Sequence, residues 1–106
     1  MNEILNSQFN PSDYGIAVVD FWADWCMPCK MLLPILERFT SEFPSITFLK
    51  ANVDENSALA RDYGISNIPT MLVFKGGKLV DKITGLSRES YLRETFDKLI
   101  SESATS

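Results

Sequence analysis

Apolar residues recur along the chain in two kinds of stretch, short runs typical of strands and longer segments with helical spacing. The run at residues 16–22 is apolar on both of its alternating sets, as expected for a central strand covered on both faces. Gly76 and Gly77 form a two-residue turn suited to a β-hairpin. The predicted strands are residues 16–22, 46–53, 70–75 and 78–84.

Helical spacing predicts four helices, at residues 2–9, 26–43, 57–63 and 87–101. Pro34 should bend the second helix, because proline lacks an N–H and crowds the preceding turn. Gly64 is placed to end the third helix. The small polar residues 102–106 are expected to fray. The apolar stripe of the second helix is predicted to contain Met31, Ile35, Leu36 and Phe39.

The order of these elements predicts an α/β fold. Strand–helix–strand connections imply parallel pairing, and the glycine hairpin adds an antiparallel pair. The expected architecture is therefore a mixed sheet flanked by helices. A chain of 106 residues leaves no room for two ordinary cores, so residues 1–106 are predicted to form one domain.

Charge and composition exclude several classes of function. Ten basic residues against fourteen acidic ones leave a net charge of −4, whereas nucleic acids and anionic membranes call for a basic surface. No apolar run approaches the roughly 18 residues that span a bilayer. The N-terminus shows no secretory signal, which favours a cytoplasmic protein.

Missing residue types exclude further chemistry. The chain has no histidine, which removes Ser-His-Asp and Cys-His catalysis and histidine-bound metals. Its two cysteines, Cys26 and Cys29, are too few for a four-thiolate metal site within one chain. No glycine-rich nucleotide motif is present. We therefore expect no metal and no bound cofactor.

The two cysteines are three residues apart, where a predicted buried strand meets a predicted helix. Positions i and i+3 of a helical turn lie about 5–6 Å apart, a Cα separation that a disulfide accepts. Backbone N–H groups at the helix start favour a thiolate at Cys26, and a thiolate is the attacking species in disulfide exchange. Cys29, one turn deeper, is expected to be less exposed and to act as the resolving thiol. The alternative is a pair of reduced thiols packed as small apolar residues.

Several segments, in order and at matching spacing, closely resemble the thioredoxin family. A Trp-Cys-x-Pro-Cys sequence followed by a distant Ile-Pro-Thr is far more specific than two spaced cysteines, and the resemblance covers nearly the whole chain. The main matching segment is Phe21-Trp22-Ala23-Asp24-Trp25-Cys26-Met27-Pro28-Cys29-Lys30. The other matches are Pro34, Gly85 and residues 52–54, 63–65, 68–70 and 74–77.

The resemblance implies a thioredoxin-like three-layer sandwich that acts as a protein-disulfide reductase and electron carrier in cell redox homeostasis. Cys26 would form a mixed disulfide with the substrate protein, and Cys29 would release it, leaving a Cys26–Cys29 disulfide. The implied partners are disulfide-containing proteins and a thioredoxin reductase that draws on NADPH. Nothing in the sequence indicates an obligate oligomer, so we expect a monomer.

Asp20 is a lone carboxylate in an apolar run, and an unpartnered buried carboxylate should have a raised pKa. The resemblance places it beneath the second cysteine, where it would assist proton transfer, and places Lys50 near it. The alternatives are a solvated carboxylate at a strand end for Asp20 and a surface lysine on a sheet edge for Lys50.

The resemblance also implies a cis Ile68–Pro69 bond facing the cysteines, with the Ile68 backbone available to pair with an extended substrate. The apolar docking surface would comprise Trp25, Met27, Pro28, Ile68, Pro69 and Gly85. Trp25 has the alternative of an ordinary core aromatic, whereas Trp22 is expected to be structural.

Met27 stands where glycine is usual in thioredoxins, Thr84 replaces a more apolar residue, and Asn67 stands where glycine is common. We expect these departures to alter substrate or reductase preference without removing the exchange chemistry.

Two other functions fit the same residues. One is a related disulfide oxidase or isomerase with the same fold and the opposite redox poise. The other is a binding module in which two protomers share a metal or iron–sulfur cluster through four thiolates.

Overall fold

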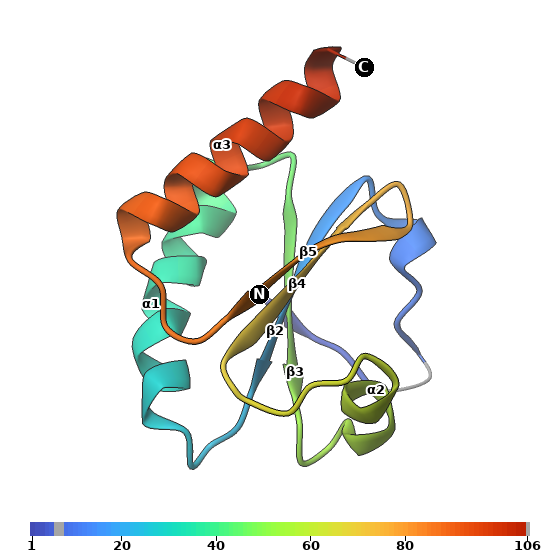
Figure 1. Cartoon of the computed structure of the whole chain (residues 1–106), viewed down its shortest axis with the longest axis vertical. Helices are drawn as coiled ribbons and strands as arrows, with labels where there is room; N and C mark the ends of the chain where they lie inside the picture. Colours follow the sequence, from blue (N-terminus) through green and yellow to red (C-terminus); the bar gives the residue numbers. More distant parts are fainter. Residues whose placement is uncertain (6–7, 106) are drawn as a thin grey trace.

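A five-stranded mixed sheet lies at the centre of the computed structural model, which describes residues 1–5 and 8–105. The strands lie in the order β1-β3-β2-β4-β5, with β3 parallel to both β1 and β2, and with β4 antiparallel to β2 and β5 (Figure 1). The strands span Asn2–Glu3 (β1), Ile16–Trp22 (β2), Thr47–Asn52 (β3), Thr70–Lys75 (β4) and Lys78–Thr84 (β5). The predicted mixed α/β sheet is confirmed.

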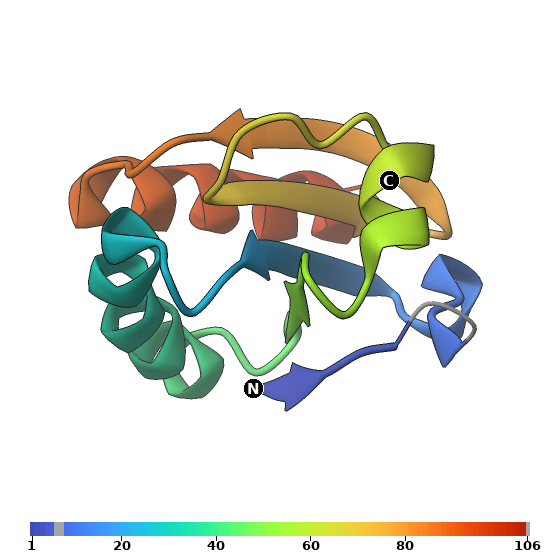
Figure 2. The same ribbon diagram turned by 90° about the horizontal axis from the view of Figure 1, so that it is seen from below.

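Three α-helices cover the two faces of the sheet. α1 and α3 lie against one face and α2 against the other, which gives the three layers seen in Figures 1 and 2. The helices span Met27–Glu42 (α1), Ser57–Asp62 (α2) and Glu89–Thr105 (α3), and a 3₁₀ turn, η2, spans Pro11–Asp13. No helix in the described part of the chain is both long and apolar enough to cross a bilayer.

Each face of the sheet has its own core, because successive residues of a buried strand point to opposite sides. On the α1 and α3 side, Val18 packs with Leu36, Phe39 and Phe96. On the α2 side, Val19 packs with Leu59 and other apolar residues of the sheet. β2 therefore has both faces buried, as its sequence predicts.

The predicted helix at residues 2–9 is wrong in its described part, since Asn2 and Glu3 pair with β3 instead. Its positions 6 and 7 lie outside the described residues. The Ile4 N–H donates to the Lys50 carbonyl at 3.0 Å, and the Ile4 side chain is buried. A helix this short is marginal by itself, whereas the free edge of β3 supplies hydrogen-bond partners immediately.

The stripe predicted for α1 is partly wrong. Leu36 and Phe39 are buried and Ile35 is half-buried, but Met31 is exposed and Leu32 occupies the buried position beside it. α1 continues through Pro34, and the bend expected there stays a prediction. α3 continues to Thr105, beyond the expected end at residue 101, because neither glycine nor proline interrupts its last turn.

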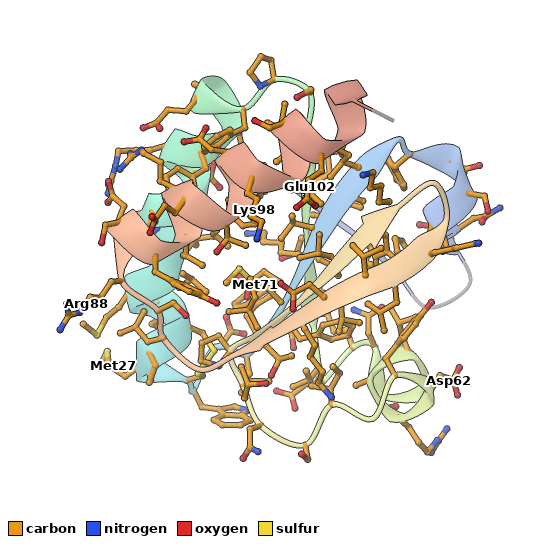
Figure 3. All side chains as sticks on the ribbon, turned by 45° about the horizontal axis from the view of Figure 1, so that its top comes forward. Met27, Asp62, Met71, Arg88, Lys98 and Glu102 are labelled. Carbon is orange, nitrogen blue, oxygen red and sulfur yellow. A yellow bond between two sulfur atoms is a disulfide. The ribbon has the colours of Figure 1, made fainter. Side chains whose placement is uncertain are left out.

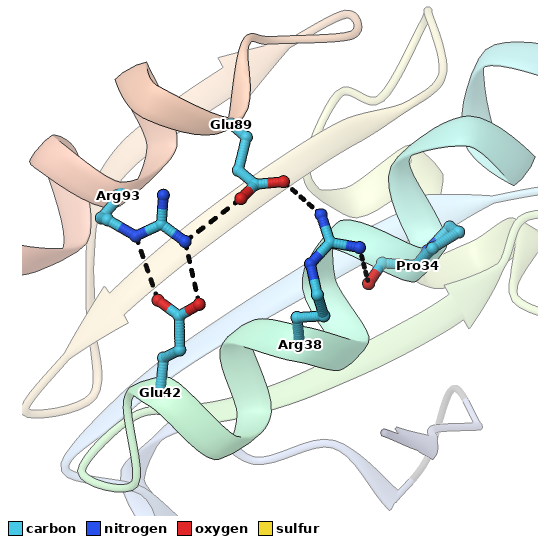
Figure 4. A network of polar contacts seen from close by, with 5 residues as sticks. All are labelled: Pro34, Arg38, Glu42, Glu89 and Arg93. Carbon is cyan, nitrogen blue, oxygen red and sulfur yellow. Dashed lines mark hydrogen bonds and ion pairs between the residues drawn. The ribbon is translucent and has the colours of Figure 1, made fainter.

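A network of charged side chains joins α1 to α3 on the surface (Figure 4). Arg93 donates two hydrogen bonds to Glu42, at 3.0 and 2.8 Å, and a third to Glu89 at 3.1 Å. Arg38 donates to Glu89 and also to the Pro34 carbonyl. The hydrogen bonds from Arg38 and Arg93 lower the pKa of Glu89. The network therefore ties the first two turns of α3 to the C-terminal half of α1.

Candidate redox site

The site is built where β2 ends and α1 begins. Cys26 is the residue that caps the N-terminus of α1, and its Sγ accepts a hydrogen bond from the Cys29 N–H at 3.3 Å. Serine, threonine or aspartate usually accept such bonds at this position. The sulfur of Cys26 thus takes the place of a capping oxygen, where unpaired N–H groups and the helix dipole favour negative charge.

Cys26 and Cys29 form a disulfide, with their Cα atoms 5.3 Å apart. Both cysteines are nearly buried, but Cys26 keeps 5% of its surface exposed and Cys29 only 2%. The expected order of exposure is therefore confirmed. Ala23, Trp22, Val53 and Ile68 pack around the pair, so the sulfurs lie in an apolar setting with Cys26 on the outer side.

Asp20 is buried in β2, and neither of its carboxylate oxygens has a hydrogen-bond partner among the described residues. Burial raises the pKa of Asp20 to about 7, and the positive charge of Lys50 opposes this rise. Asp20 and Lys50 are paired in register across β2 and β3. The alternative of a solvated carboxylate at a strand end is therefore wrong.

Lys50 does not lie on a sheet edge, because β1 pairs with the outer side of β3. Its ammonium lies 3.6 Å from a carboxylate oxygen of Glu3 and 5.1 Å from the centre of the Trp22 ring. Glu3, Lys50 and Asp20 thus form a row across three strands, with the lysine between two carboxylates. The sequence does not place Glu3 near Lys50, because its pattern predicts a helix where Glu3 lies in a strand.

The Ile68–Pro69 bond is cis, as the resemblance implied. The Gly85 N–H donates to the Pro69 carbonyl at 2.8 Å, which holds the end of β5 against this segment. Gly85 has a φ of +87°, a conformation that favours glycine. Ile68 packs against the two cysteines. The structure therefore brings Ile68, Pro69 and Gly85 together beside the disulfide.

Trp25 is exposed beside Cys26, so its alternative as a core residue is wrong. Its indole N–H donates to a carboxylate oxygen of Asp54 at 3.0 Å. The Asp54 N–H in turn donates to the side chain of Asn52 at 2.9 Å, which orders the loop after β3. The matching Asn52-Val53-Asp54 segment could have pointed to this contact, but nothing in its local pattern assigns Asp54 to Trp25.

A groove of about 330 Å³ opens beside Cys26, with Trp25 as one wall. Met27 and Pro28 are exposed on the first turn of α1, directly after Cys26 in the chain. Within the described residues, no three acidic or cysteine side chains gather into a metal site. The groove is lined by Trp25, Val53, Ile65, Ser66, Asn67 and Ile68. We call it the Trp25 groove.

Comparisons with known proteins agree with this geometry. The family model described as Thioredoxin matches residues 3–98. Thioredoxin of Chlamydia pneumoniae is 45% identical over 84 residues, covering 79% of this chain and 82% of the relative. Thioredoxin of Staphylococcus epidermidis is 41% identical over 98 residues, covering 91% of this chain and 94% of the relative.

Solved structures give the same result. Oxidized mitochondrial thioredoxin 3 of Saccharomyces cerevisiae matches with a TM-score of 0.86 and 30% identity, over 92% of this chain and 94% of the other. Plasmodium falciparum thioredoxin matches with a TM-score of 0.86 and 31% identity, over 92% and 98%. The chain therefore belongs to the thioredoxin family, and Cys26 and Cys29 are the redox pair of a thiol–disulfide oxidoreductase.

Proposed function

We propose that this protein is a monomeric cytoplasmic thioredoxin that reduces disulfides of other proteins and is itself re-reduced by thioredoxin reductase. The observation that carries the proposal is the position of the Cys26 sulfur. This sulfur caps α1, accepts a hydrogen bond from the Cys29 N–H, and lies between an apolar groove and the first turn of the helix. A thiolate placed there is stabilised and lies beside surface that a polypeptide can cover.

In the first step, the Cys26 thiolate attacks one sulfur of the substrate disulfide. A bond forms between Cys26 and that sulfur, the substrate S–S bond breaks, and the other substrate sulfur leaves as a thiolate. Cys26 takes this role because it has the larger exposed surface and the capping position.

In the second step, Cys29 attacks Cys26 within the mixed disulfide. The Cα separation of 5.3 Å allows the two sulfurs to bond without moving α1. The substrate leaves with two reduced sulfurs, and the protein keeps the Cys26–Cys29 disulfide. Two electrons have then passed from this protein to the substrate, and the reductase returns two electrons from NADPH.

Cys29 must lose its proton before it attacks, and we assign Asp20 as the acceptor. A pKa of about 7 suits a general base that works near neutral pH. Asp20 is buried and has no other hydrogen-bond partner among the described residues, so its oxygens are free to take a proton. Lys50 is assigned a positioning role, since its charge lowers the pKa of Asp20.

The substrate segment would lie across the surface formed by Trp25, Met27, Pro28, Ile68, Pro69 and Gly85. The Ile68 backbone is available to pair with an extended segment, which adds main-chain hydrogen bonds that do not depend on substrate sequence. Such pairing suits a reductase that acts on many proteins.

The test follows NADPH oxidation by thioredoxin reductase in the presence of a disulfide-containing protein. The wild-type protein should sustain turnover, and Cys26→Ser should abolish it. Cys29→Ser should accumulate a mixed disulfide through Cys26, visible by mass spectrometry and released by dithiothreitol.

Two further variants sharpen this test. Asp20→Asn should slow resolution of the mixed disulfide more than its formation. Asp24→Asn, which removes an exposed carboxylate four residues further along the chain, serves as its control. Turnover by Cys26→Ser, or trapping through Cys29 instead of Cys26, would refute the assignment.

A further inference from the structure

Three exposed apolar residues that do not line the Trp25 groove belong to α1 and to the connection between β5 and α3. Met27 is 67% exposed and Met31 57%, and they lie one turn apart on α1. Leu86, in the connection between β5 and α3, is 44% exposed. We call these three residues the methionine patch. The two methionines are not part of the core, because the buried side of α1 is formed by Cys29, Leu32, Leu36 and Phe39.

The methionine patch lies beside the reacting sulfur. Met27 directly follows Cys26, and the hydrogen bond from Gly85 to Pro69 holds the start of the β5–α3 connection near the cis bond. That connection runs beside the first turns of α1 in both views (Figures 1 and 2). The Trp25 groove is instead formed by Trp25 and by the connections on either side of α2. The groove and the patch therefore flank Cys26 on two sides.

Positive charge borders the methionine patch, although the chain as a whole carries −4. Lys30 lies between the two methionines in sequence, and Arg88 follows Leu86 by two residues; both cations are exposed. Figure 3 shows Met27 and Arg88 on the same side of the molecule. Across residues 1–5 and 8–105, neither cation takes part in a salt bridge. The side of Trp25, by contrast, carries the carboxylate of Asp54.

We propose that the methionine patch and its two cations bind the substrate polypeptide next to the target cysteine, and thereby select disulfides flanked by a large apolar residue and an acidic residue. The inference rests on the proposed reductase function, since attack by Cys26 is what brings a polypeptide against the patch. A helix rises about 1.5 Å per residue, so Met31 lies about 6 Å beyond Met27. This equals about two residues of extended chain, which places the selected residues within about three positions of the cysteine.

The experiment measures the second-order rate constant with which the pre-reduced protein attacks short peptides. Each peptide carries one cysteine in a mixed disulfide with thionitrobenzoate, a low-pKa leaving group that directs attack to the peptide sulfur. One peptide has Leu-Asp before the cysteine, one has it after, and reference peptides have Ser-Ser or Leu-Lys. The readout is the ratio of rate constants between peptides, measured for each variant of the protein.

The wild type should attack one Leu-Asp peptide about tenfold faster than the Ser-Ser peptide, the factor expected from covering roughly half of two methionine side chains. The double variant Met27→Gln/Met31→Gln keeps side-chain length and helix propensity, and its ratio should fall below about two. Lys30→Glu/Arg88→Glu should reverse the preference between Leu-Asp and Leu-Lys. Val80→Ala, at 49% exposed on β5, is the control and should keep the wild-type ratios.

Two failures are distinguishable. A wild type that cannot reduce even the symmetrical small disulfide of thionitrobenzoate would overturn the proposed function and the inference with it. A wild type that reduces this disulfide but shows no peptide preference, or a glutamine double variant that keeps the tenfold ratio, would overturn the inference alone. So would a concentration-dependent dimer that the glutamine double variant abolishes, because a second copy would then cover the patch.

Discussion

Asparagine in place of Asp20 should remove most of the pH dependence of stability between about pH 4 and pH 8. Burial raises the pKa of Asp20 from 3.8 to about 7 in the folded protein, against the opposing charge of Lys50. A raised carboxyl pKa means that the folded protein holds the proton more tightly than the unfolded chain does. Ionisation therefore destabilises the fold: the cost is absent below the unfolded pKa, grows between the two values, and is complete above about pH 7.

The size of the effect follows from the difference in pKa. A difference of about 3, multiplied by about 1.36 kcal/mol per pKa unit, amounts to roughly 4 kcal/mol. Asparagine has the shape of the neutral acid and cannot ionise, so Asp20→Asn should be more stable than the wild type by about 4 kcal/mol near pH 8 and by about 1.5 kcal/mol near pH 5.

The assay is guanidinium denaturation of the oxidised protein, in which the disulfide-bonded cysteines do not titrate. Asp24→Asn removes one exposed carboxylate and controls for the change in net charge. If wild type and Asp20→Asn lost stability in parallel between about pH 5 and pH 8, the carboxylate would be solvated and the reasoning from burial would be refuted.

Three further predictions concern Lys50, Asp54 and Phe96. Lys50→Met should move the pH midpoint of the Asp20-dependent stability change upward, because the positive charge that lowers the pKa of Asp20 is lost; an unchanged midpoint in the same titration would contradict this. Asp54→Ala should free the Trp25 indole and lower kcat/KM for a protein disulfide about fivefold, whereas Asp54→Asn keeps an acceptor and should lose less; equal losses would show that the hydrogen bond is immaterial. Phe96→Ala should lower the free energy of unfolding by about 3–5 kcal/mol, with Phe96→Leu losing clearly less, because the ring is fully buried among other aromatics; a loss under about 1 kcal/mol would mean that this core is loosely packed.

Most secondary structure was predictable because it depends on neighbours along the chain. β4 and β5 have the predicted bounds, and the two glycines between them have the positive φ values, 59° and 82°, that a two-residue hairpin requires. β2 was predictable because seven residues with both faces apolar belong only in the middle of a covered sheet.

The errors share one cause, which is dependence on a distant partner. β1 exists because the edge of β3 is available, and nothing within residues 2–9 shows that edge. Met31 fits a helical stripe on spacing alone, but the inner surface of α1 is already filled by Leu32 and its neighbours. A hydrophobic pattern states which residues can be buried, and the packing of other elements decides which of them are.

The sequence alone identified the two reacting cysteines of the site. Two cysteines three apart at a strand-to-helix junction must lie within disulfide reach and must place the first sulfur at the helix start, since both properties are local to one turn. The tertiary structure alone decided what surrounds that pair: Asp54 against Trp25, Glu3 and Asp20 on either side of Lys50, and the β5–α3 connection beside the first turns of α1. Those residues are far apart in the sequence and meet only because strands, helices and their connections pack together, so no local pattern carries their pairing.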